Sequence, residues 1–162
     1  MCLVIGLSKA YAMTGWRIGF AASNEALTAA MRKIQSQTTS NPNSIAQAAA
    51  VEALNGPQDA INVMVEHFKQ RHEFIVSALN ETNGMNCLAG DGAFYAFPDC
   101  RELIGSLDDV DSDVALSQHI LNEAEVAVVP GSAFGGNGYI RLSFATSMDN
   151  LEEAMQRLQR IF

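Results

Sequence analysis

Apolar runs and helical periodicities alternate along this chain, and this pattern predicts a mixed α/β fold. Residues 2–7, "CLVIGL", form a continuous apolar run of strand length, which is typical of a strand buried on both faces of a sheet. The sheet neighbours of such a strand are expected from later sequence. Residues 17–22, "RIGFAA", predict a second strand. A helix is expected to begin near Asn24, where apolar residues start to recur at helical spacing.

The middle of the chain is predicted to be helical and is divided by one polar loop. The loop covers residues 36–44, and its last residue, Ser44, can cap a helix over residues 45–54. That helix is expected to stop at Asn55-Gly56-Pro57. A long helical pattern follows and ends at Asn83-Gly84, a C-cap signal.

In the second half, shorter strands are predicted among helices. The expected strands and helices cover residues 92–98, 112–124, 126–130, 139–145 and 151–161. Acids lie early in the last helix and arginines late, as the helix dipole favours. The glycine-rich residues 131–138 lack the lysine and the following helix of a P-loop, so we interpret them as a connection between strands.

Composition narrows the classes of function. The net charge of -8 argues against non-specific binding to nucleic acid, which needs a basic face. The apolar start is too short for a membrane span and lacks a basic leader, so a cytoplasmic location is expected. Three cysteines without a C-x-x-C pair favour reduced thiols. The three histidines lack the spacing of metal ligands, and we expect no metal site.

The segment "GLSKAYAMTGWRIGF", residues 6–20, carries the strongest candidate chemistry. Lys9 lies among small and apolar residues, eight positions ahead of Arg17, and no acid occurs from Met1 to Asn24. Apolar surroundings and a nearby cation both favour the unprotonated amine, which is the nucleophilic form of lysine. Ser8 and Arg17 add a hydroxyl and a guanidinium, a pair suited to phosphate. The residues alone fit either a lysine that forms an imine with a phosphorylated aldehyde or a strand–loop–strand with incidental cations.

This segment resembles the pyridoxal-phosphate attachment signature of the class I aminotransferases. The shared features are a small residue, an apolar residue, Ser and Lys, followed by Gly-x-Arg-apolar-Gly. Similarity to the bacterial aspartate aminotransferase group continues through residues 33–54, 92–98, 126–135 and 139–145, and so covers essentially the whole chain. The resemblance implies pyridoxal 5'-phosphate as cofactor and amino-group transfer between an aspartate-like L-amino acid and a 2-oxo acid.

The resemblance also implies roles for individual residues. Lys9 would form the Schiff base with the cofactor and move a proton as general acid and base, while Ser8 and Arg17 would hold the cofactor phosphate. Arg141 matches the arginine that binds the substrate α-carboxylate. It lies in an apolar strand where an unpaired guanidinium is unfavourable, and the alternative is a structural arginine paired with a neighbouring acid. Residues 38–42, "TTSNP", resemble a segment that reaches the neighbouring subunit, which implies a homodimer.

By the same resemblance, the chain corresponds to the C-terminal part of the fold type I architecture of pyridoxal-phosphate-dependent transferases. Residues 1–56 would end the large cofactor-binding domain, residues 57–84 would form the connecting helix, and residues 85–162 would form the small α+β domain. Other cofactor contacts of the family lie upstream of the lysine. Two alternatives therefore remain, namely a truncated, non-catalytic folded or dimerising module, and another fold type I enzyme that uses the same cofactor.

Overall fold

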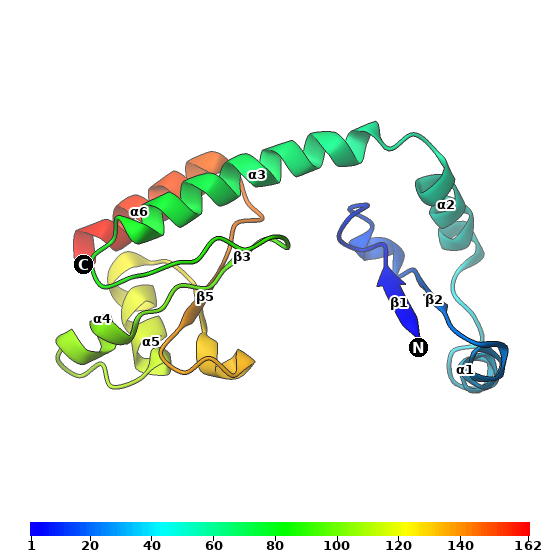
Figure 1. Ribbon diagram of the computed structural model, residues 1–162, viewed down its shortest axis with the longest axis horizontal. Coiled ribbons are helices and arrows are strands. Elements are labelled where there is room, and N and C mark those ends of the chain that lie inside the picture. The colour runs from blue at the N-terminus through cyan, green and yellow to red at the C-terminus, as the bar shows by residue number, and fades with distance from the viewer. The chain divides into compact units, whose positions relative to one another are not determined.

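The computed structural model describes all 162 residues, which form two compact units, Met1–Met64 and Val65–Phe162 (Figure 1). The first unit contains β1 (Leu3–Gly6), the short 3-10 helix η1 (Thr14–Trp16), β2 (Gly19–Ala22), α1 (Glu25–Thr38) and α2 (Ser44–Asn55). Helix α3 (Asp59–Asn80) begins in the first unit and continues into the second.

Strands β1 and β2 form an antiparallel hairpin, with Leu3 opposite Ala22 and Gly6 opposite Gly19. The expectation that the first strand is buried on both faces was wrong, because Leu3 is 50% exposed and Val4 75% exposed. The neighbour of β1 is the next strand in sequence, and a two-stranded sheet covers neither of its own faces. A continuous apolar run gives no information on how many strands flank it.

A small apolar core supports the loop between these two strands. Leu7, Met13 and Ile18 come from the loop and its ends, and all three side chains are buried. They pack with Ala46 and Ala50 of α2, whose small side chains let the helix backbone approach closely. Helix α2 therefore fixes the loop that contains Lys9.

The helix starts in this unit follow side-chain capping, with one difference from the sequence-based expectation. Asn24 caps α1, since its side-chain oxygen accepts a hydrogen bond from the Leu27 N–H at 2.9 Å. Asn43 rather than Ser44 caps α2, because its Oδ1 accepts from the N–H groups of Ile45 and Ala46. Asparagine is as good an N-cap as serine, so composition alone did not decide between these adjacent positions.

The second unit is an α+β arrangement around a three-stranded antiparallel sheet of order β3-β5-β4. Its elements are β3 (Tyr95–Ala96), α4 (Arg101–Ser106), α5 (Asp113–Ala124), β4 (Val129–Pro130), the 3-10 helix η2 (Gly131–Phe134), β5 (Ile140–Ser143) and α6 (Met148–Ile161). The strands are shorter than the predicted runs, and the short helix α4 was not predicted. Helix α5 lies within the expected residues 112–124, and the Ser112 hydroxyl caps it.

The core of the second unit determines how β5 is oriented. Ile140 and Leu142 of β5 are buried, together with Phe144 just after it. Alternate residues of a strand point to opposite faces, so Arg141 lies on the face away from this core. The remaining core residues come mainly from α3, α5 and α6, and include Ile75, Leu79, Leu116, Ile120, Leu151, Met155 and Leu158.

All three cysteines are free, and two of them, Cys87 and Cys100, are buried in the second unit. Burial is the main cause that raises the pKa of the Cys100 thiol to about 12, which keeps the thiol neutral. None of the helices combines the length and the apolar composition that spanning a bilayer requires.

The pairing of β1 with β2 leaves no room for a side chain at Gly19. A Cβ at Gly19 would lie 2.6 Å from the carbonyl oxygen of Ile5, whereas a Cβ at Gly6 would meet nothing within 4 Å. We therefore expect Gly19→Ala to weaken the strand pairing by about 1.4 kcal/mol or more, and so to speed hydrogen exchange at the Leu7 amide about tenfold. Gly6→Ala is the matched control, and equal exchange rates in the two variants would contradict this account.

Candidate active site

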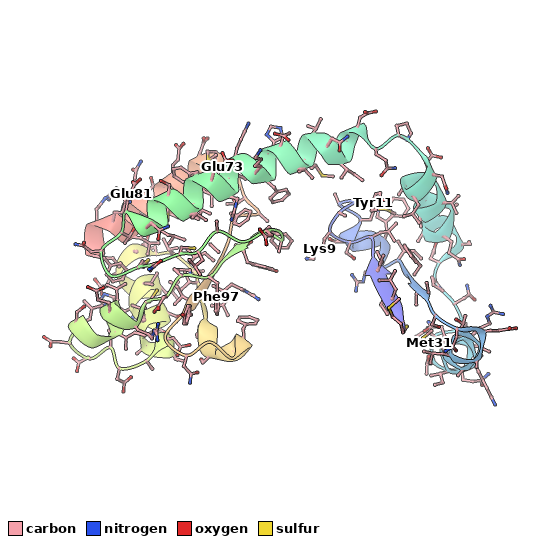
Figure 2. All side chains as sticks on the ribbon, viewed as in Figure 1. Lys9, Tyr11, Met31, Glu73, Glu81 and Phe97 are labelled. Carbon is pink, nitrogen blue, oxygen red and sulfur yellow. The ribbon has the colours of Figure 1, made fainter.

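Lys9 lies in the turn that follows β1, on the same loop as Tyr11, and both are labelled in Figure 2. The Ala12 N–H donates to the Lys9 carbonyl oxygen at 3.0 Å, which closes the turn. Ala12 has a left-handed backbone with φ of 52°. A non-glycine residue adopts this conformation only where its surroundings enforce it, and here the buried Met13 side chain anchors the chain one residue later.

Ser8 and Arg17 are joined through Thr14. The Thr14 hydroxyl donates to the Ser8 carbonyl oxygen at 2.9 Å, and Arg17 Nη1 donates to the Thr14 carbonyl oxygen at 3.1 Å. Arg17 also has a left-handed backbone, with φ of 51°. Sequence reasoning missed Thr14, although a hydroxyl residue inside an otherwise apolar loop was a usable signal.

A shallow groove of about 410 Å³ runs along this hairpin, and Ser8 and Arg17 supply its polar side chains. The rest of its lining comes from glycines and apolar residues of β1 and β2. Arg17 takes part in none of the three salt bridges of the chain, and the nearest acid in sequence is Glu25. A hydroxyl and a guanidinium without a carboxylate partner form a donor set that fits a phosphate group.

Arg141 belongs to the second unit, where two aromatic rings contact its guanidinium. The guanidinium carbon lies 3.8 Å from the ring centroid of Phe134 and 4.4 Å from that of Tyr95. Both distances fall within the range of cation–π attraction. No salt bridge of the chain includes Arg141, so the alternative of a structural arginine paired with a neighbouring acid is not found.

Sequence reasoning also missed the two rings at Arg141. Tyr95 comes from β3, which pairs with β5, and Phe134 comes from η2, which directly follows β4, the other neighbour of β5. Aromatic residues in short apolar runs are typical of core positions, yet Tyr95 and Phe134 are exposed. Only the strand order places them beside one arginine.

A second hollow, of about 640 Å³, is lined by polar residues that include Asp99 and Arg101. The hydrogen bond from Arg101 is the main cause that lowers the pKa of Asp99 to about 2. The backbone of Asp99 bridges to both Asn86 and Tyr139. The Asp99–Arg101 ion pair therefore lies where the segments of Asn86, Asp99 and Tyr139 meet, and we interpret its role as structural.

The chain matches the family model "Aminotransferase class I and II" over residues 1–158. It is 56% identical over 158 residues to an aspartate/prephenate aminotransferase of Nitrosomonas europaea, covering 94% of this chain and 40% of that protein. It is 48% identical to an aspartate aminotransferase of Rhizobium meliloti, covering 96% of this chain and 39% of that protein. The chain thus spans about 40% of the length of these curated relatives.

Solved structures give the same result for the fold. The crystal structure of the Rhizobium meliloti aspartate aminotransferase matches with a TM-score of 0.94 and 46% identity, over 98% of this chain and 41% of that chain. An aromatic aminotransferase from Pyrococcus horikoshii matches with a TM-score of 0.91 and 40% identity, over 99% and 42%. The expected fold, a part of the fold of these aminotransferases, is confirmed.

The family model covers nearly the whole chain, and the hairpin loop around Lys9 lies within the matched region. The chain belongs to the aminotransferase class I and II family.

Proposed function

We propose that this chain is part of a pyridoxal-phosphate-dependent aminotransferase that moves an amino group between an aspartate-like L-amino acid and a 2-oxo acid. The observation that carries the proposal is the loop that combines Lys9 with Ser8 and Arg17 in a segment without acids. The names of the relatives, aspartate and aspartate/prephenate aminotransferase, support the choice of substrates. Since the chain spans about 40% of those relatives, the complete activity is proposed for the whole protein.

The residues of the hairpin fit pyridoxal 5'-phosphate. The Ser8 hydroxyl and the Arg17 guanidinium would bind its phosphate, and Lys9, next to Ser8, would supply the amine that bonds to its carbonyl carbon. When bound, this cofactor supplies an electron sink that makes the Cα–H bond of an amino acid acidic. The loop geometry limits the freedom of all three residues, because Thr14 links Ser8 to Arg17 and Leu7 and Ile18 are buried beside them.

Lys9 would act as the general base that accepts the proton from the substrate Cα and as the acid that returns a proton. The neutral amine is needed for the first task and the ammonium for the second. The sequence around Lys9, from Met1 to Asn24, contains no acid that could take over this proton transfer.

Arg141 would bind the α-carboxylate of both substrates. A planar guanidinium can donate two parallel hydrogen bonds to a carboxylate, which fixes its orientation as well as its position. The rings of Tyr95 and Phe134 support this role, since they contact the cation without neutralising its charge. Arg141 therefore offers its charge to an incoming anion instead of to an acid of this chain.

We extend the proposal to the organisation of the protein. Residues 1–56 would complete a large cofactor-binding domain, and residues 85–162 would form the small domain. Residues 57–84 would form the helix that connects these two domains. Apolar side chains of the first unit that remain more than half exposed, such as Ile34, Ile45 and Val51, support packing against more protein. We propose that the protein forms a homodimer, and light scattering that reports a monomer would refute this. The free cysteines support a cytoplasmic location.

Trapping of the cofactor on one lysine tests the proposal directly. The chain has only three lysines, Lys9, Lys33 and Lys69. Incubation with pyridoxal phosphate and reduction with borohydride should give one saturable adduct, which peptide mapping should assign to Lys9. Lys9→Ala should lose this adduct and Lys33→Ala should keep it. An adduct spread evenly over all three lysines would contradict the proposal.

A turnover measurement separates this function from its alternatives. The chain is supplied with pyridoxal phosphate, aspartate and 2-oxoglutarate, and glutamate is measured. Turnover that disappears in Lys9→Ala would exclude a non-catalytic folded module. A specific Lys9 adduct without any turnover would favour that module, and consumption of aspartate without glutamate would favour another fold type I enzyme.

A further inference from the structure

Asp113 is a buried carboxylate at the first turn of α5, and the proposed function gives it no role. It is only 5% exposed, and no salt bridge of the chain includes it. Its Oδ2 accepts a hydrogen bond from the Ser132 N–H at 2.7 Å, nineteen residues further along the chain. Since buried carboxylates are unfavourable unless they are satisfied, this contact is a strong constraint on both segments.

The Asp113 carboxylate contacts the start of the loop that joins β4 to β5, through the Ser132 N–H. Burial opposes its ionisation, but hydrogen bonds from the Ser132 side chain and backbone and from the Asp113 and Gly138 backbones outweigh burial and lower the pKa of Asp113. Ser132 lies at the start of the loop and Gly138 at its end. One charged side chain therefore holds the start of the loop.

Backbone hydrogen bonds also hold this loop, since the Gly131 N–H donates to the Tyr139 carbonyl oxygen at 2.8 Å, and the Asp113 carboxylate adds a side-chain contact near its start. Glycines occupy four of the eight positions from Gly131 to Gly138, and two of them, Gly135 and Gly138, have φ of 80° and 82°. Phe134, the one large side chain between them, is 50% exposed and belongs to no core cluster. The position of the Phe134 ring thus depends on the backbone of η2, which begins beside the Asp113 contact.

The Phe134 ring is in turn the closer of the two rings at Arg141, with 3.8 Å between the guanidinium carbon and the ring centroid. Tyr95 lies on β3, which is paired directly with β5 and so is fixed by strand hydrogen bonds. The sheet thus fixes the position of the Tyr95 ring, whereas the loop between β4 and β5 fixes the position of the Phe134 ring.

We propose that Asp113 is a positioning residue for Arg141. Its carboxylate holds η2 so that the Phe134 ring lies against the guanidinium, which keeps the N–H groups of Arg141 directed at a substrate carboxylate. The consequence for binding rests on the proposed function of Arg141, whereas the structural link from Asp113 through Phe134 to Arg141 does not.

The structural link is tested by NMR of the Arg141 side chain in the full 162-residue chain. Ring currents should move the Arg141 Hε resonance away from its random-coil position, and Phe134→Ala should return it part of the way. Asp113→Ala should cause a similar return, while Asp111→Ala, which changes an exposed acid two residues earlier, should leave the resonance in place. An unchanged Hε resonance in Asp113→Ala, beside a clear shift in Phe134→Ala, would overturn the proposal.

A conservative variant keeps the test decisive if Asp113→Ala does not fold. Asp113→Asn retains an acceptor oxygen but loses the charge, so the Ser132 amide and Arg141 Hε resonances should move together and by less. Movement of the Ser132 amide while Arg141 Hε stays fixed would show that the loop does not transmit the change, and would overturn the proposal.

Binding of 2-oxoglutarate, followed by the same Arg141 resonance, distinguishes this inference from the proposed function. Asp113→Ala should weaken binding about tenfold, in the range expected for loss of one cation–π contact and its ordering, and Asp113→Asn should recover part of it. Affinity in Asp113→Ala equal to wild type would overturn the positioning role. If even the wild-type chain shows no binding, the carboxylate role of Arg141 fails, and the ring-current result alone decides the structural link.

Discussion

The backbone hydrogen bond from Leu7 N–H to the Ile18 carbonyl oxygen, at 3.2 Å, is the constraint on which the candidate cofactor site depends. It continues the pairing of β1 with β2 and closes the loop between them. Both side chains are buried, so the closure is reinforced by packing against α2. Ser8 and Arg17 directly follow and precede these two anchors. Residues nine positions apart in sequence thus become neighbours at the neck of one loop, with Lys9 beside them.

A comparable constraint acts in the second unit, where packing rather than a turn orients the functional side chain. Ile140 and Leu142 lie in the core, so strand alternation turns Arg141 to the other face of β5. On that face it meets aromatic rings and no acid. In both units, buried apolar neighbours thus position an arginine, Arg17 or Arg141, that forms no salt bridge in the chain, an arrangement that suits binding of anionic ligands.

The sequence predicted the local features well, because each depends on residues close together in the chain. The helix that begins near Asn24 and the helix that follows Ser112 were found in this way. The errors have different causes. Capping by Asn43 instead of Ser44 was a choice between equivalent side chains, and the exposure of β1 depends on how many strands flank it, which a continuous apolar run does not encode.

In the candidate site, too, the sequence identified residues that form a local motif but not the partners that the fold brings to them. The segment around Lys9 was recognisable as a motif because its functional residues are contiguous, and Arg141 stood out as a lone cation in an apolar strand. The partners of Arg141 did not, since Tyr95 and Phe134 approach it only through the strand order β3-β5-β4. Asp113 is separated from the loop it holds by the whole of α5, so no sequence pattern marked the contact.

A crystal structure of the chain grown with pyridoxal phosphate tests the central claim most directly. The account predicts continuous electron density from the Lys9 amine nitrogen into the cofactor, with the phosphate against the Ser8 hydroxyl and the Arg17 guanidinium. Cofactor density at another lysine, or a phosphate bound away from Ser8 and Arg17, would contradict it.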